Sequence, residues 1–163
     1  MRQGDQFLSY GELVAAVERV REQLQGERFG LLLDNQPAWA VLDLALLGAR
    51  KLCVPLPGFF SPGQLRHAVA DAGLDCLLTD QPQRVSELCG RSVERSVSVA
   101  GRELALFRLA PRPRRARAGA LVKVTYTSGT TGKPKGVCLS WDAIQPVVDA
   151  LGAAGEVDRR DVA

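Results

Sequence analysis

One short stretch of the chain, residues 126–137, limits what the rest can be. It reads Tyr-Thr-Ser-Gly-Thr-Thr-Gly-Lys-Pro-Lys-Gly-Val, and it combines three glycines, four Ser or Thr hydroxyls and two lysines. Glycines let the backbone approach a ligand without a Cβ in the way. Exposed N–H groups, hydroxyls and ammonium groups together are how proteins hold phosphate oxygens. The stretch therefore predicts a phosphate-binding loop between two strands.

Two familiar phosphate loops do not fit this stretch. The Walker A pattern G-x-x-x-x-G-K-[ST] cannot be aligned to it, because Lys133 is followed by Pro134. The G-x-G-x-x-G pattern of dinucleotide folds does not occur in it either. From composition alone, a solvated Gly/Ser/Thr loop without a ligand stays open as the alternative.

Helical and extended segments alternate ahead of the loop. Ser9 with Glu12 and Ser61 with Gln64 have the spacing of capping boxes at helix starts. Helices are predicted at 9–25, 38–47, 61–72 and 83–90, and apolar strands at 29–33, 52–56 and 76–79. Short strands at 97–99 and 104–109 suit a hairpin. This order predicts an α/β fold of right-handed βαβ units, with a mostly parallel sheet and flanking helices.

Three consecutive regions follow from this pattern. We expect residues 1–110 to form an α/β subdomain, 111–119 a Pro/Arg-rich exposed loop, and 120–163 a strand-loop-strand-helix segment that continues into a region absent from this chain. No aromatic residues are interleaved with the arginines, so a solvated loop is favoured over a nucleic-acid contact. Ser140 is placed to cap a last helix. Pro146 cannot lie deep in that helix without a kink, which predicts that its regular part starts near Gln145.

Composition narrows the class of protein. The chain has 163 residues, is 46% hydrophobic and 24% charged, and carries a net charge of +3, which is ordinary for a soluble domain and does not imply nucleic acid. No apolar run approaches the roughly 20 residues of a membrane span, and no signal peptide is recognisable, so a cytoplasmic protein is expected. The four cysteines are far apart, so neither disulfides nor a zinc site are expected. His67, the single histidine, has no nucleophile motif beside it.

Residues 126–137 closely resemble the phosphate-loop signature of the adenylate-forming, or AMP-binding, superfamily. Acyl-CoA synthetases, adenylation domains of peptide synthetases and luciferases carry it as [YF]-T-S-G-[TS]-T-G-x-P-K-G-V, which matches here at every position. The upstream blocks at 31–39, 44–48, 54–56, 64–72 and 77–79 are similar too, so the resemblance covers essentially the whole chain. One departure is Trp141, where many members carry His.

The resemblance implies an ATP-dependent acyl ligase that releases AMP. In such enzymes a carboxylate attacks the α-phosphate of ATP, and the acyl group of the adenylate then passes to a thiol. The loop would hold the β- and γ-phosphates through the hydroxyls of Thr127, Ser128, Thr130 and Thr131, the backbone of Gly129 and Gly132, and the charges of Lys133 and Lys135. Position 133 varies in the family, so Lys135 is the stronger candidate of the two lysines.

The family's later elements are absent from these residues. They are the magnesium-binding Glu motif, the ribose-binding Asp block and the C-terminal domain with its catalytic Lys. We therefore expect the N-terminal part of a longer ligase, inactive alone, with no catalytic residue or metal ligand of its own. ATP and Mg²⁺ are the expected cofactors, a carboxylic (fatty) acid the substrate, and CoA the acceptor. An enzyme that loads a carrier protein, a truncated binding module without turnover, and nucleic-acid binding through Arg112 to Arg117 stay open as alternatives.

Overall fold

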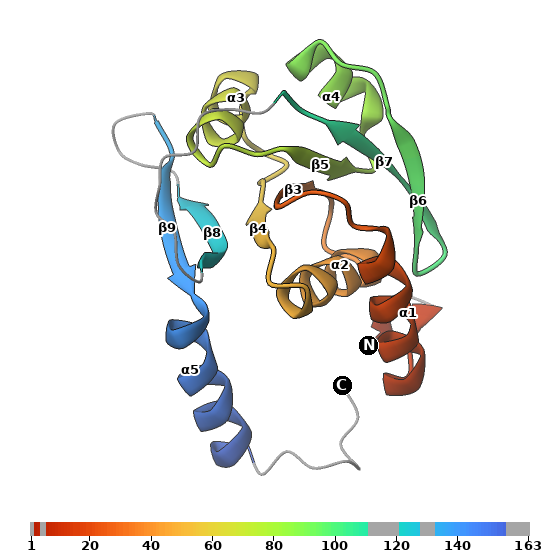
Figure 1. Cartoon of the computed structure of the whole chain (residues 1–163), viewed down its shortest axis with the longest axis vertical. Helices are drawn as coiled ribbons and strands as arrows, with labels where there is room; N and C mark the ends of the chain where they lie inside the picture. The colour runs from red at the N-terminus through yellow and green to blue at the C-terminus, as the bar shows by residue number, and fades with distance from the viewer. Residues whose placement is uncertain (1, 4–5, 111–120, 128–132, 156–163) are drawn as a thin grey trace.

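The computed structural model describes residues 2–3, 6–110, 121–127 and 133–155. Within these residues the core is a seven-stranded sheet in the order β6-β7-β5-β3-β4-β8-β9 (Figure 1). Its strands are β3 (Arg28–Leu32), β4 (Leu52–Pro55), β5 (Cys76–Thr79), β6 (Arg95–Val99), β7 (Arg102–Arg108), β8 (Leu121–Thr127) and β9 (Lys135–Ser140). A second small sheet pairs β1 (Arg2–Gln3) with β2 (Gln6–Phe7).

The centre of the sheet is parallel and both of its edges are antiparallel. Strands β5, β3, β4 and β8 run in the same direction, whereas β7 lies antiparallel to β5, and β9 antiparallel to β8. The predicted hairpin is formed by β6 and β7. Its two turn residues, Ala100 and Gly101, have φ of 48° and 76°, and positive φ at both positions is what a two-residue type I′ turn requires. The α/β fold class is confirmed.

Five helices connect or follow the strands in the described residues. They are α1 (Tyr10–Gln23), α2 (Pro37–Gly48), α3 (Pro62–Asp71), α4 (Pro82–Cys89) and α5 (Trp141–Ala154). Both predicted capping boxes are confirmed: Ser9 and Glu12 satisfy each other's backbone N–H at the start of α1, and Ser61 and Gln64 do the same for α3. Neither α1 nor any other helix in the described part is long and apolar enough to cross a membrane.

The helices cover the two faces of the sheet in separate layers. Helices α1 and α2 lie on one face, and α3 and α4 on the other (Figure 1). Consecutive strand residues enter opposite layers, because side chains alternate across a strand. Thus Leu31 packs in the first layer with Val20 and Val41, whereas Leu32 packs in the second with Leu65. The strand that leads into the predicted phosphate loop, β8, belongs to this same sheet.

Helix α5 begins at the cap that the sequence predicts, but it is regular earlier than expected. The hydroxyl of Ser140 accepts the N–H of Ala143 at 3.3 Å, and the helix runs from Trp141 straight through Pro146. The expectation that its regular part starts near Gln145 is wrong: Pro146 is exposed and removes a single donor, while the cap and the following turns hold the rest of the helix. No residue of α5 is buried. Its apolar side chains, Val147, Val148 and Leu151, are 55%, 55% and 66% exposed.

Candidate functional site

The predicted phosphate loop joins β8 to β9 at one end of the sheet order. Thr127 faces Lys135 in the last pair of the ladder, and Tyr126 faces Gly136 in the pair before it. The structure thus brings Thr127 and Lys135 together at the end of the hairpin, with Lys133 two residues ahead of Lys135. The other predicted site residues, Ser128, Gly129, Thr130, Thr131 and Gly132, lie outside the described residues.

The two lysines supply positive charge at this end of the hairpin. Lys133 and Lys135 are both exposed, and neither forms an ion pair within the described part of the chain. Thr127 Oγ1 lies 3.5 Å from the carbonyl oxygen of Lys135. Exposed ammonium groups without carboxylate partners can bind an anion, so these residues fit a polyphosphate. The described residues contain no group of three His, Cys, Asp or Glu side chains that could hold a metal ion.

Gly136 is required by close packing rather than by its backbone angles. A Cβ at this position would lie 2.9 Å from Val124 Cγ1 and 3.3 Å from two ring atoms of Tyr126. The ring of Tyr126, which is 4% exposed, therefore covers the glycine on the neighbouring strand. The conformation of the hairpin depends on this pair, because a larger residue would push the ring or the strand aside.

Polar contacts anchor β8 on both of its faces. On one face the O–H of Tyr126 donates to Asp71 Oδ2 at 2.8 Å, on helix α3. On the other face Lys123 Nζ lies 2.7 Å from Asp43 Oδ2, on helix α2, and 5.7 Å from the centre of the Trp39 ring. Burial of the phenol, and next its hydrogen bond to Asp71, raise the pKa of Tyr126 above its ordinary value, so the phenol stays protonated. The strand leading into the loop is therefore held by the two flanking helices.

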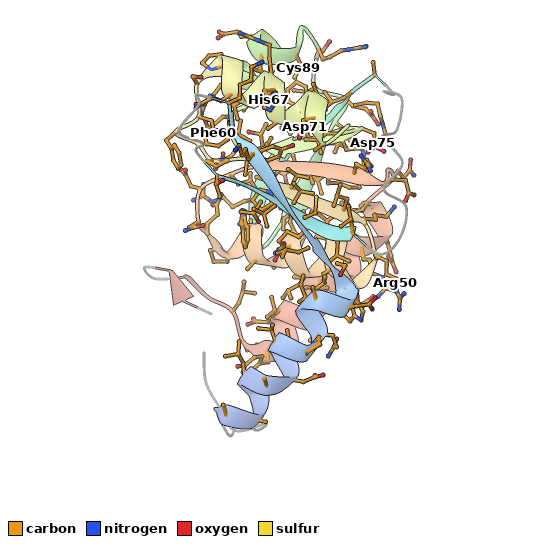
Figure 2. The ribbon with its side chains drawn as sticks, turned by 90° about the vertical axis from the view of Figure 1, so that its left-hand side faces the viewer. Arg50, Phe60, His67, Asp71, Asp75 and Cys89 are labelled. Atoms are coloured by element: carbon orange, nitrogen blue, oxygen red, sulfur yellow. The ribbon has the colours of Figure 1, made fainter. Side chains whose placement is uncertain are left out.

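Sequence reasoning did not connect His67 with the loop. The structure places Nε2 of His67 at 3.2 Å from the carbonyl oxygen of Pro134, between the two lysines. His67 and Asp71 lie on the same helix, α3 (Figure 2). Their spacing of four residues puts them on one helix face, which was the available sequence signal, but nothing in the sequence says which segment that face contacts.

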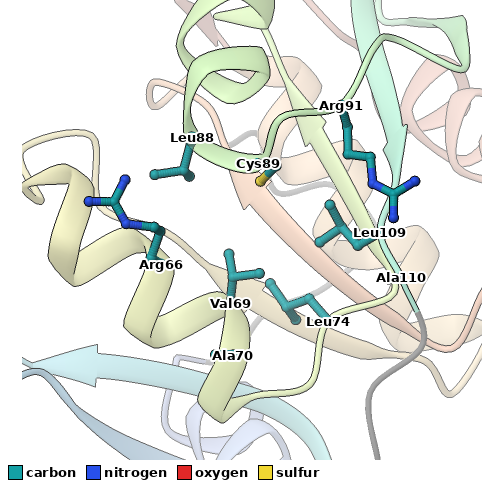
Figure 3. A pocket seen from close by; sticks show the side chains of 9 residues that line it. All are labelled: Arg66, Val69, Ala70, Leu74, Leu88, Cys89, Arg91, Leu109 and Ala110. Carbon is teal, nitrogen blue, oxygen red and sulfur yellow. The ribbon is translucent and has the colours of Figure 1, made fainter.

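A hollow lies between α3, α4 and the end of β7 (Figure 3). Its volume is about 400 Å³. Apolar side chains such as Val69, Leu74 and Leu109 line it, and the guanidinium groups of Arg66 and Arg91 lie at its sides. None of its described lining residues belongs to 126–127 or 133–137, the described parts of the predicted phosphate loop.

The family of the chain follows from its similarity to known proteins. A family model described as "AMP-binding enzyme" matches residues 1–162. The chain belongs to the AMP-binding enzyme family. The resemblance seen in residues 126–137 is thereby confirmed, and the match extends over nearly all of this AMP-binding chain.

Curated relatives of this AMP-binding chain include ligases with different acceptors. It is 31% identical over 166 residues to L-proline–[L-prolyl-carrier protein] ligase of Streptomyces coelicolor, covering 86% of this chain and 31% of that protein. It is 28% identical over 167 residues to feruloyl-CoA synthase of an Amycolatopsis species, covering 96% and 34%. It is 26% identical over 176 residues to human long-chain-fatty-acid–CoA ligase 6, covering 85% and 25%. The chain thus spans about a third or less of the length of these relatives.

Solved structures of similar AMP-binding enzymes share the fold. O-succinylbenzoate coenzyme A synthetase from Bacillus subtilis, in complex with AMP, superposes with a TM-score of 0.65 at 25% identity, covering 98% of this chain and 43% of that one. ATP-bound MatB from Rhodopseudomonas palustris superposes with a TM-score of 0.66 at 26% identity, covering 90% and 32%. The described architecture is therefore that of the N-terminal region of an adenylate-forming enzyme.

Proposed function

We propose that this chain contributes the phosphate loop of an ATP-dependent, AMP-forming acyl ligase. The observation that carries the proposal is the pair of exposed lysines, without ion-pair partners among the described residues, at the end of a hairpin anchored to α2 and α3. Family membership and the ATP-bound structural relative support the choice of ATP as the phosphate ligand.

In this proposal the loop binds the β- and γ-phosphates of ATP. When a carboxylate attacks the α-phosphate of ATP, the bond between the α-phosphate and pyrophosphate breaks. Negative charge then moves onto the departing pyrophosphate. This charge would be stabilised by the ammonium groups of Lys135 and Lys133 and by the Thr127 hydroxyl. The remaining phosphate contacts would come from the hydroxyls and backbone of residues 128–132. Such catalysis is positioning and electrostatics without a covalent step on the protein. The magnesium ligands and catalytic groups are expected outside these 163 residues.

A fatty acid is the proposed carboxylic substrate, and CoA the proposed acceptor. Relatives named as feruloyl-CoA synthase and long-chain-fatty-acid–CoA ligase support CoA. The relative named as a carrier-protein ligase supports a carrier protein as the alternative acceptor. Both acceptors present a thiol, so both readings use the same adenylate and the same phosphate loop. We also propose that the protein is located in the cytoplasm.

Titration of the 163-residue chain with MgATP tests the phosphate loop directly. We expect Lys135→Ala to weaken binding about tenfold, the effect of one lost charge-assisted contact, and Lys133→Ala to weaken it less. Arg102→Ala is the matched control, because it removes one exposed positive charge from the β6–β7 hairpin at the other end of the sheet order. Equal affinity of wild type and Lys135→Ala would refute the assignment.

The second part of the proposal is that these 163 residues alone do not catalyse adenylation of a carboxylic acid. Carboxylate-dependent exchange between ATP and pyrophosphate measures adenylation without needing the acceptor. We expect no exchange from the isolated chain with dodecanoate, ferulate or proline as the acid. Sustained exchange with any of them would show that the chain holds a complete adenylation site.

A further inference from the structure

Helix α3 reaches both strands of the phosphate-loop hairpin with two polar side chains. Asp71 accepts the O–H of Tyr126 at 2.8 Å, which anchors the end of β8. His67, four residues earlier and so on the same helix face, lies with Nε2 at 3.2 Å from the carbonyl oxygen of Pro134, just ahead of β9. One helix therefore contacts the chain on the way into the loop and again on the way out.

The chemistry of the two atoms sets the direction of the His67 contact. A carbonyl oxygen can only accept a hydrogen bond, so Nε2 of His67 must carry the proton and donate it. Pro134 has no backbone N–H, so this carbonyl is its only polar backbone group. Pro134 is buried and precedes the first residue of β9, and the ladder with β8 ends at the pair Thr127 and Lys135. The bond from His67 thus holds the carbonyl that directly precedes the first residue of β9.

We propose that His67 is a positioning residue of the phosphate loop. By holding the Pro134 carbonyl it fixes the orientation of the backbone between Lys133 and Lys135, and so the place of both ammonium groups relative to a bound phosphate. Asp71 and His67 together clamp the two ends of the loop onto α3. The inference rests on the proposed function, because the loop that it positions is assigned to phosphate there.

Three variants separate hydrogen bonding from packing at this position. His67→Leu keeps a side chain of similar size but removes the hydrogen-bond donor. His67→Gln places an amide N–H at about the reach of Nε2 and should restore the bond. Arg66→Gln is the matched control, since this exposed neighbour on the same helix has no hydrogen bond or ion pair to any described residue.

A backbone readout tests the inference without any ligand. In ¹⁵N NMR spectra of the 163-residue chain, we expect the proton of the neutral His67 ring to be on Nε2. We expect the amide resonances of Lys133 and Lys135 to shift in His67→Leu, to return toward wild type in His67→Gln, and to stay in place in Arg66→Gln. A protonated Nδ1 with a bare Nε2, or unchanged lysine amides in His67→Leu, would overturn the inference.

Binding of MgATP supplies the functional readout on the same variants. We expect His67→Leu to weaken binding about fivefold, with His67→Gln within about twofold of wild type, as loss and recovery of one hydrogen bond allow. If wild type and His67→Leu bind MgATP equally, positioning by His67 is refuted and the proposed function stands. If wild type binds no MgATP while the amide shifts follow the expected pattern, the backbone role of His67 stands and the assignment of the loop to ATP in this chain fails.

Discussion

The hydroxyl of Tyr126 donates a 2.8 Å hydrogen bond to the carboxylate of Asp71, which lies 55 residues earlier in the chain. Tyr126 is the first residue of the phosphate-loop signature and is buried, whereas Asp71 is the last residue of α3 and is exposed. The bond therefore joins a buried donor to an acceptor that water can reach. The first signature residue is an anchor to the neighbouring helix as well as a part of the hairpin.

Removing the Tyr126 hydroxyl tests this anchor. We expect Tyr126→Phe to lower the free energy of unfolding by about 1 kcal/mol, the value of a typical hydrogen bond and less than that of a bond to a charged group, because water can rehydrate Asp71 once the donor is gone. Urea denaturation followed by circular dichroism measures the change. Tyr10→Phe, at a tyrosine that is 54% exposed, should leave the midpoint unchanged. Identical midpoints for wild type and Tyr126→Phe would contradict the prediction.

A methyl group at Gly136 tests the packing of the hairpin. The added Cβ would lie 2.9 Å from Val124 Cγ1, so we expect Gly136→Ala to destabilise the protein by about 1–3 kcal/mol through overpacking. Gly152→Ala is the matched control. A Cβ there meets nothing within 4 Å, and the site is inside α5, so we expect a gain of about 0.5–1 kcal/mol. Thermal melts compare the two, and a melt of Gly136→Ala at or above that of wild type would rule out the close contact.

The contact between Asp43 and Lys123 should behave as a coupled pair. Their side chains are only 16% and 21% exposed, and Asp43 Oδ1 has no hydrogen-bond partner among the described residues. Removing either residue alone leaves a partly buried charge unpaired. We expect the double substitution Asp43→Ala with Lys123→Ala to cost at least about 1 kcal/mol less than the sum of the single costs, as contacting pairs usually do. Additive free energies in the double-mutant cycle would show that the two charges do not interact.

Alkaline pH should weaken the fold. Burial, and next the charge of Asp75, raise the pKa of the Cys76 thiol to about 12, from 9.0 in an unperturbed thiol. Between these values the unfolded chain has lost a proton that the folded chain keeps, so the free energy of unfolding falls as pH rises, and the thiol has no such effect below pH 9. The raised pKa values of Cys53 and Tyr126 act in the same direction.

Urea denaturation at pH 7.5, 9 and 10.5 measures this dependence. We expect similar stability at the first two values and a clear loss at the third. Cys76→Ala should reduce the loss of unfolding free energy between pH 9 and 10.5, because it removes one of the titrating groups. A destabilisation by Cys76→Ala that is the same at every pH does not affect this comparison. A stability that rises between pH 9 and 10.5 would contradict the assigned direction of the shifts.

The sequence predicted the local structure better than the tertiary contacts. The capping boxes at Ser9 and Ser61 were recognisable because each is built from residues three positions apart. The hairpin around Gly101 was recognisable for a similar reason. The N-cap at Ser140 was also recognisable, but Pro146 led to a wrong position for the regular part of the helix, because a proline near a capped start removes only one backbone donor.

The parts of the site that the sequence did not supply are contacts between distant segments. His67 with Pro134 and Tyr126 with Asp71 are separated by 67 and 55 residues. Which helix lies beside the hairpin depends on the strand order, since β8 joins the sheet next to β4 and not beside its neighbour in sequence, β7. The signature predicted a phosphate loop from its residue types alone, but it could not show that α3 contacts the chain on both sides of it.

Strand β9 ends the sheet order, and among the described strands only β8 pairs with it. The other side of β9, which is unpaired among the described strands, is therefore a template on which another strand can add, from elsewhere in a longer polypeptide or from a second molecule. Val137, at 49% exposure, favours such growth of the sheet, whereas the charge of Lys135 at the start of the strand opposes it. The lysine proposed to attract phosphate thus also protects an open sheet edge from aggregation, so its replacement should affect the solubility of the chain together with its ligand binding.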